Sequence, residues 1–178
     1  MKLFKMRSYK FPAGIILILL FTFSCGKIEK LPPEPSITFK SFEVFDSTDL
    51  LGNKVKGGRL TFHFVDGDGD LGLPAPNQAA GSDSTNLFFT LFRKTGGTFI
   101  QVADNDPLKP SSYRIPFMDR QGQNKILRGN IGITFLYLFY SPSDTIKYSF
   151  FVKDRAEHSS DTASTCVIIL TKNGICNN

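Results

Sequence analysis

The chain has 178 residues and a formal net charge of +5. Residues 1–24 hold four of the 21 lysines and arginines and none of the 16 acidic residues, so the rest of the chain carries 17 basic against 16 acidic residues. This nearly neutral body lacks the basic surface on which nucleic-acid binding depends, and nucleic acid is excluded as a partner. The remaining length suits one domain with a substantial core.

The N-terminal segment predicts export and a lipid anchor. Basic residues precede the apolar run Phe11–Phe23, and small residues flank Cys25, which is the layout of a secretory signal peptide. The run is shorter than the roughly 20 apolar residues of a membrane-spanning helix. A cysteine at the cleavage point resembles the lipobox of bacterial lipoproteins, in the looser form of the Bacteroidetes group, because Thr22 stands where the strict lipobox has leucine.

This resemblance implies that Cys25 is acylated, with palmitate among the acyl chains, and that residues 1–24 form a signal peptide that is removed. An ordinary signal peptide that leaves Cys25 as a free thiol is the alternative. The residues after Cys25 lack the acidic run associated with surface export in this group. We therefore expect a lipid-anchored protein of the cell envelope, on the periplasmic face of the outer membrane rather than on the cell surface.

Proline-rich sequence follows the cysteine and predicts a tether over residues 25–36. An extended proline-rich segment rises about 3.1 Å per residue, so the 11 residues after Cys25 could reach about 35 Å from the lipid. We expect the folded domain to cover residues 37–172, with residues 173–178 as a C-terminal tail.

Apolar residues alternate with polar ones along most of the expected domain, which is the period of a β-strand. The clearest case is Thr145–Asp154, whose expected inward residues are Ile146, Tyr148, Phe150 and Val152. The other inward sets are Leu60, Phe62 and Phe64; Leu87, Phe89 and Leu91; Ile131, Ile133, Phe135, Tyr137 and Phe139. In residues 37–45 the alternation slips by one near Lys40–Ser41, which indicates a β-bulge in an edge strand.

Short strands are also expected at residues 98–102, 112–115 and 166–171, with Gly96–Gly97 as a hairpin turn. No segment keeps a helical period over three turns. About eight strands separated by glycine, proline, asparagine and aspartate predict an all-β fold, an antiparallel β-sandwich.

The segment TIKYSFFVKDRAEHSSDTASTCVIIL resembles the final hairpin of bacterial immunoglobulin-like and cadherin-like domains, through Asp154, Ala156 and Ser159. Two other segments, GRLTFHFVDGDGDLGL and YRIPFMDRQG, resemble parts of uncharacterised Bacteroidetes lipoproteins with a similar sandwich. The resemblance implies an immunoglobulin-like β-sandwich at the cell envelope, and it implies no activity.

Asp66, Asp68 and Asp70 form the densest acidic cluster, on a loop that alternates aspartate with glycine. Three carboxylates on such a loop can converge on Ca²⁺, which takes six to eight oxygen ligands. The loop is not an EF-hand, because Leu71 stands at the sixth position, where glycine is required. A solvated turn, made by aspartate and glycine for conformational reasons alone, is the competing interpretation.

Immunoglobulin strand order would place three acidic loops at one end of the sandwich, namely residues 66–70, 103–111 and 154–161. Asp154 is then an additional candidate ligand for Ca²⁺. Clustered carboxylates repel one another unless a cation or an arginine compensates, and Arg155 could provide that charge.

Cys166 and Cys176 are the cysteines that follow Cys25. Disulfides form outside the cytoplasm, but this pairing requires the tail to fold back on the last strand. A Cys166–Cys176 disulfide and two free thiols both remain open.

Catalytic constellations are absent from the sequence. His63 falls on the outward face of an expected strand and His158 in a turn, neither with a metal-binding spacing. In residues 135–140 both faces are apolar. Either the loop of residues 71–86 covers one face, or that face is an interaction surface for a partner.

Taken together, these features predict a lipid-anchored, non-catalytic envelope protein whose domain binds another envelope protein or stabilises an assembly. The alternative is a carbohydrate-binding lipoprotein of a nutrient-uptake system. Sugar-binding platforms favour tryptophan and tyrosine, whereas this chain has no tryptophan and four tyrosines after the signal segment, so a glycan partner is less favoured.

Overall fold

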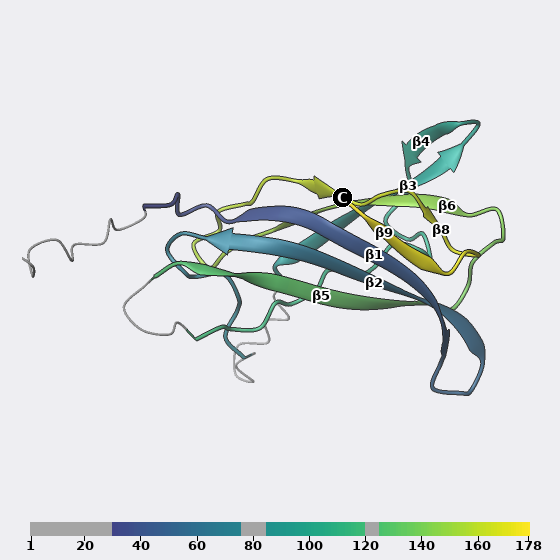
Figure 1. The fold of residues 1–178 in the computed structure, drawn as a ribbon, viewed down its shortest axis with the longest axis horizontal. Coiled ribbons are helices and arrows are strands. Elements are labelled where there is room, and N and C mark those ends of the chain that lie inside the picture. Colours follow the sequence, from purple (N-terminus) through teal and green to yellow (C-terminus); the bar gives the residue numbers. More distant parts are fainter. Residues whose placement is uncertain (1–29, 76–84, 120–124) are drawn as a thin grey trace, which may run out of the picture. The chain divides into compact units, whose positions relative to one another are not determined.

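The computed structural model describes residues 30–75, 85–119 and 125–178, and Leu31–Asn178 form one compact unit. Over the described residues this unit contains strands and no helix, as the sequence predicts (Figure 1). The strands are β1 (Ser36–Thr48), β2 (Lys54–Asp66), β3 (Leu87–Thr95), β4 (Thr98–Gln101), β5 (Leu127–Tyr137), β6 (Thr145–Val152), β7 (Ala163–Ser164), β8 (Ile168–Ile169) and β9 (Gly174–Asn177).

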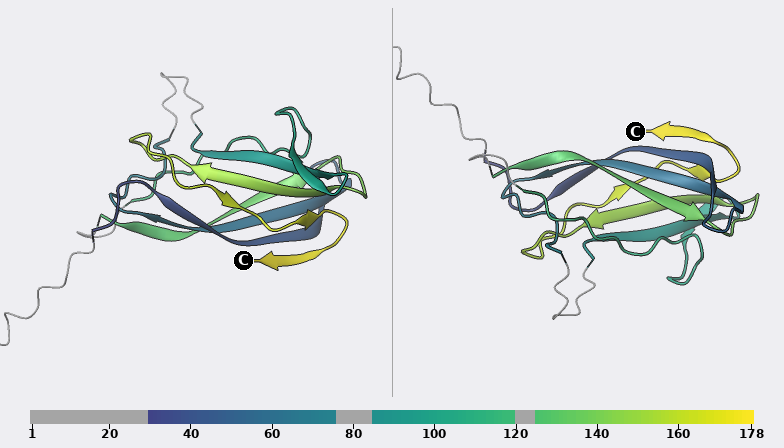
Figure 2. Two further views of the ribbon diagram at one scale, coloured as in Figure 1. Left: turned by 90° about the horizontal axis from the view of Figure 1, so that it is seen from above. Right: turned by 90° about the horizontal axis from the view of Figure 1, so that it is seen from below.

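Two antiparallel sheets face each other (Figure 2). The first has the order β5-β2-β1-β9, and the second has the order β4-β3-β6-β7, with β8 also paired to β6. This arrangement confirms the expected all-β, antiparallel class and is consistent with a β-sandwich.

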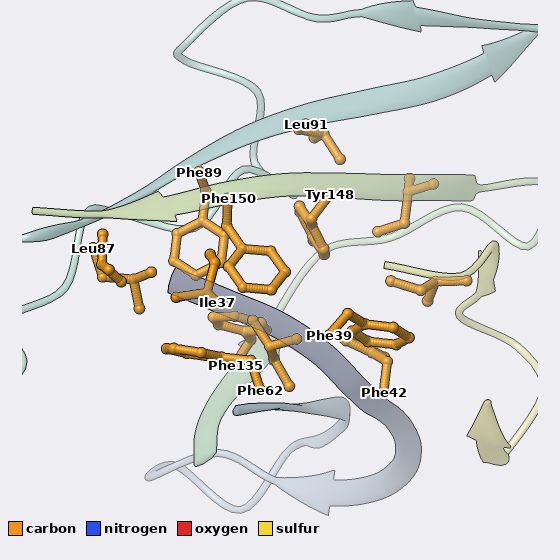
Figure 3. Close-up of a cluster of buried hydrophobic side chains, with 14 of the residues drawn as sticks. Ile37, Phe39, Phe42, Phe62, Leu87, Phe89, Leu91, Phe135, Tyr148 and Phe150 are labelled. Carbon is orange, nitrogen blue, oxygen red and sulfur yellow. The ribbon is translucent and has the colours of Figure 1, made fainter. Parts of the chain in front are cut away.

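The core lies between the two sheets and is rich in phenylalanine (Figure 3). Phe62 of β2 and Phe150 of β6 are fully buried, and their ring centroids are 5.3 Å apart across the two layers. Because side chains alternate between the faces of a strand, the inward faces of β2, β3 and β6 carry the apolar residues that the sequence placed there, and these residues are buried. The inward faces predicted for these three strands are therefore confirmed.

The predicted bulge in β1 is also confirmed. The pairing of β1 with β2 shifts register between Phe39 and Ser41, so Phe39 and Phe42 both point into the core. However, β1 is not an edge strand, because β9 pairs with its other side at residues 41–44.

The C-terminal residues 173–178 were expected as a tail, and this expectation is wrong for most of them. Gly174–Asn177 form β9 at the edge of the first sheet. The structure also joins Cys166 to Cys176 in a disulfide, with Cα atoms 6.4 Å apart. This bridge ties β9 in the first sheet to the segment between β7 and β8 beside the second sheet. The tail is thus part of the fold.

Part of the proline-rich segment belongs to the folded domain. Leu31–Pro35, which we call the strap, belong to the compact unit, with Pro35 buried and Leu31 half-buried. The backbone N–H of Ile37, the second residue of β1, donates to Asp161 Oδ1 at 3.0 Å. The domain therefore starts about six residues earlier than the expected boundary at 37. Cys25 and the signal segment lie outside the described residues.

Two smaller expectations are corrected. Phe139 was placed in the core but is 75% exposed, because β5 ends at Tyr137. Residues 112–115 form no strand, and Tyr113 makes only an isolated bridge with Leu87. Leu136 and Leu138 are exposed, and most of the loop expected to cover them lies outside the described residues.

Candidate metal centre

The three predicted aspartates lie where β2 ends. Asp66 is the last residue of β2, and residues 66–70, the aspartate loop, then turn away from the sheet. Gly69 has a φ of +72°, a conformation that glycine adopts without strain. Gly67 is required for a different reason, since a Cβ there would overlap the carbonyl oxygen of Pro32 in the strap. The loop is therefore shaped by glycine at two positions.

The structure brings the carboxylates of Asp66, Asp68 and Asp70 together. One carboxylate oxygen from each lies within 4.8 Å of the others. Asp66 is completely buried, and Asp68 and Asp70 are at most partly exposed. The Oδ1 atoms of all three are buried and have no hydrogen-bond partner. Because buried polar atoms are almost always paired, three adjacent unpaired oxygens make this group the candidate ligand site of the described residues.

Asp66 is held in a fixed orientation by its second oxygen. The backbone N–H of Leu71 donates to Asp66 Oδ2 at 2.6 Å. This bond closes the loop over the end of β2. It therefore uses one oxygen of Asp66 and leaves Oδ1 for the group of three.

The aspartate loop brings like charges close together in a partly buried place. Burial, followed by the charges of Asp154, Asp68 and Asp66, raises the pKa of the Asp70 carboxyl, and only Arg155 acts in the opposite direction. The pKa of Asp66 is also raised, chiefly by burial and then by the neighbouring Asp68 carboxyl. The raised pKa values of Asp66 and Asp70 mean that their ionised forms are disfavoured by burial and by the neighbouring carboxylates.

Asp154 lies beside this group but already has partners. Its side chain is fully buried, and both of its oxygens accept hydrogen bonds from His158, from the backbone N–H at 2.8 Å and from Nδ1 at 2.9 Å. Asp154 therefore adds negative charge near Asp70 while its own oxygens are already paired. Sequence reasoning missed the role of His158, although the four-residue spacing from Asp154 within one turn was a usable signal.

The guanidinium of Arg155 contacts the chain that follows the aspartate loop and an aromatic ring. Its Nη1 donates to the Gly72 carbonyl at 2.8 Å, and its Cζ lies 4.9 Å from the centroid of the Phe117 ring. Through these two contacts Arg155 holds the chain just after the aspartate loop in position. Its charge lowers the pKa of Asp70, but this effect is smaller than those of burial and of the neighbouring carboxylates.

The expectation that three acidic loops share one end is wrong for residues 103–111. Asp106 pairs with Arg93 at 2.8 Å, and Asp104 pairs with Lys109. Arg93 lies near the C-terminal end of β3, the end of the second sheet opposite to Val152 and Asp154. The hairpin from β3 to β4 carries the chain to that opposite end. Two loops therefore share the end that carries the three aspartates, which we call the cation pole: residues 66–70 and residues 154–161.

The donor set suits a hard cation. Carboxylate oxygens are the ligands that Ca²⁺ prefers, and zinc-type nitrogen or sulfur ligands are absent from the group of three. Three carboxylates with one oxygen each leave at least three positions of a six- to eight-coordinate Ca²⁺ for carbonyl oxygens or water.

Comparisons with known protein families, with curated proteins and with solved structures found no match. Across residues 30–75, 85–119 and 125–178, no helix is long and apolar enough to span a membrane. The functional argument therefore rests on the geometry of the cation pole.

Proposed function

We propose that the protein is a lipid-anchored, non-catalytic component of the cell envelope, whose immunoglobulin-like β-sandwich binds Ca²⁺ and presents a surface to an envelope partner. The observation that carries the calcium proposal is the group of three buried, unpaired carboxylate oxygens on Asp66, Asp68 and Asp70. Bound Ca²⁺ compensates their repulsion, so the ion stabilises the folded domain.

Strand order supports the immunoglobulin-like part of the proposal. In such domains strands A, B and E share one sheet, and strands C and F lie side by side in the other. Here β1, β2 and β5 are neighbours in the first sheet, and β3 pairs with β6 in the second. With β4 beside β3, and β7 and β8 beside β6, the order fits that pattern, and β9 is an addition to it.

The lipid anchor rests on the N-terminal sequence. Acylation of Cys25 after removal of residues 1–24 holds the domain at a membrane, for which we propose the periplasmic face of the outer membrane. A partner protein is favoured over a glycan because Tyr137 and Tyr148 are buried and Tyr113 is half-buried. Tyr140 is then the exposed tyrosine among the described residues, and one ring makes a poor stacking platform.

A calcium titration of thermal unfolding tests the metal proposal. A ligand that binds only the folded state adds RT ln(1 + [L]/Kd) to its stability, about 2.7 kcal/mol at 100 Kd, which corresponds to several degrees in Tm. Extracellular-type sites have Kd values of about 10⁻⁴ to 10⁻³ M, so the titration extends to tens of millimolar. Mg²⁺ should substitute poorly, because it requires tighter octahedral geometry.

Asp68→Asn should abolish the calcium response with little effect on the calcium-free protein, because it removes a charge that repels its neighbours. Asp104→Asn is the matched control, since Asp104 is paired with Lys109 away from the cation pole. Equal shifts with calcium and magnesium, or a calcium response that survives in Asp68→Asn, would show that the aspartate loop is only a turn.

A further inference from the structure

The strap and the aspartate loop are in direct backbone contact. A Cβ built on Gly67 would overlap the carbonyl oxygen of Pro32 and would lie 2.8 Å from the carbonyl oxygen of Leu31. Two main-chain oxygens of the strap therefore lie against the middle of the loop that holds the three aspartates. The close approach is possible because residue 67 is glycine.

Other contacts hold the strap at the same pole. Pro35 is buried, and the N–H of Ile37 donates to Asp161 in the second acidic loop. Glu34 of the strap and Asp68 of the aspartate loop both raise the pKa of His158, after the larger contribution of its hydrogen bond to Asp154. The strap therefore lies against the aspartate loop and near the second loop of the cation pole.

A second observation besides charge points to a ligand at the aspartate loop. Asp66 is completely buried, and its Oδ1 has no partner. Three carboxylates leave a bound Ca²⁺ short of its usual six to eight oxygens, and neutral main-chain carbonyls are ordinary Ca²⁺ ligands. The carbonyls of Leu31 and Pro32 are oxygens of this kind beside the same loop.

We propose that the strap is part of the calcium site, so that Ca²⁺ binding at the aspartate loop and seating of Leu31–Pro35 on the cation pole are thermodynamically coupled. This inference rests on the proposed calcium function. Bound Ca²⁺ draws the strap carbonyls toward the loop, and a seated strap raises calcium affinity. By linkage the two effects are equal, and couplings of this type are roughly 5- to 150-fold.

Trypsin cleavage after Lys30 measures whether the strap is seated. Lys30 is exposed and its scissile bond joins it to half-buried Leu31, so the bond is cleaved when the strap leaves the pole. In the full-length protein purified in detergent, 10 mM Ca²⁺ should slow this cleavage on the order of ten-fold relative to EDTA. Cleavage after Lys172, in an exposed turn before β9, is the internal reference for the effect of calcium on trypsin itself.

Gly67→Ala tests the same coupling from the other side. The new Cβ displaces the strap and removes no carboxylate. Cleavage after Lys30 should then be fast with and without calcium, and the calcium Kd should rise by about the factor by which calcium protects Lys30 in the native protein. Gly132→Ala is the matched control, because a Cβ at Gly132 meets nothing within 4 Å.

The outcomes separate the two proposals. If calcium raises the Tm of the native protein but leaves cleavage after Lys30 unchanged, the strap inference is overturned and the calcium site stands. This measurement needs no variant, so it decides the question even if Gly67→Ala fails to fold. If calcium neither raises the Tm nor protects Lys30, both proposals are overturned.

Discussion

Asp66 and Tyr148 are both fully buried polar residues, but their hydrogen bonding differs. The hydroxyl of Tyr148 donates to the Leu108 carbonyl at 2.7 Å and lies 3.1 Å from the hydroxyl of Tyr137. Asp66 Oδ1, in contrast, has no partner. A paired buried group stabilises the fold, whereas an unpaired one destabilises it. The contrast assigns the tyrosine pair a structural role and supports the proposal that the aspartate group binds a ligand.

At alkaline pH the tyrosine pair should lose its stabilising effect. Burial raises the pKa of Tyr148 and of Tyr137 above the ordinary value of about 10. The unfolded chain then releases these protons at lower pH than the folded protein does. The free energy of unfolding should therefore fall as pH rises above about 10.

Tyr148→Phe removes one of these protons and should make the alkaline loss shallower, by up to about 1.4 kcal/mol per pH unit. The same change should cost about 1–3 kcal/mol at pH 7, because the Leu108 carbonyl is left buried without its donor. Urea denaturation between pH 7 and pH 11 measures both effects. If the free energy of unfolding of Tyr148→Phe fell with pH as steeply as that of the native protein, Tyr148 would not be a cause of the alkaline loss of stability.

At the scale of the element, β6 divides into two faces of different energetic weight. Phe150 is fully buried against Phe62, whereas Lys147 lies on the opposite face of the strand. Phe150→Ala should cost about 3–5 kcal/mol of stability and Lys147→Ala well under about 1 kcal/mol. Denaturant unfolding measures both, and equal small effects would show that the burial of Phe150 contributes little.

Alternation of residue type predicted these faces because it depends only on the strand's own period of two. The bulge in β1 was predictable for the same reason, since the sequence of apolar residues itself slips between Phe39 and Phe42. The alternation of apolar and polar residues was therefore sufficient to predict which face of a strand is buried.

Long-range pairing was not predictable in this way. The pairing of β9 with β1 joins residues more than 120 positions apart, and Gly174–Asn177 carry too little alternation to indicate a strand. The position of Asp106 was missed because the β3–β4 hairpin carries the loop to the opposite end, where Arg93 pairs with it. The site aspartates were recognised from their spacing, but the contact of Gly67 with Pro32 depends on tertiary packing.

At the scale of the whole molecule, the seated strap limits how far the domain can stand from a membrane. The compact unit begins at Leu31, six residues after Cys25. An extended chain spans at most about 3.6 Å per residue, so these residues reach roughly 20 Å rather than the 35 Å expected for a free tether. If Cys25 is acylated, the cation pole is the end of the domain that is held near the lipid.

The lipid anchor itself is tested by mass and by fractionation. The mature protein should lack residues 1–24 and carry acyl chains on Cys25, and Cys25→Ala should leave the protein unlipidated, so that a salt wash releases it or the signal segment remains uncleaved. Intact mass spectrometry and membrane fractionation measure these outcomes. A native protein with no lipid on Cys25 would end the anchor hypothesis.

The orientation relative to the membrane is a separate prediction. β2 has 13 residues and is therefore about 43 Å long, which separates the cation pole from the β1–β2 hairpin. A dye at Glu34 in the strap should consequently show strong energy transfer to a fluorescent lipid headgroup, and a dye at Leu51, 87% exposed in that hairpin, should show much less. Calcium should strengthen the difference, because a seated strap leaves fewer residues between the lipid and the domain. Equal transfer from the two positions would mean that the domain lies flat on the membrane or moves freely on a longer tether.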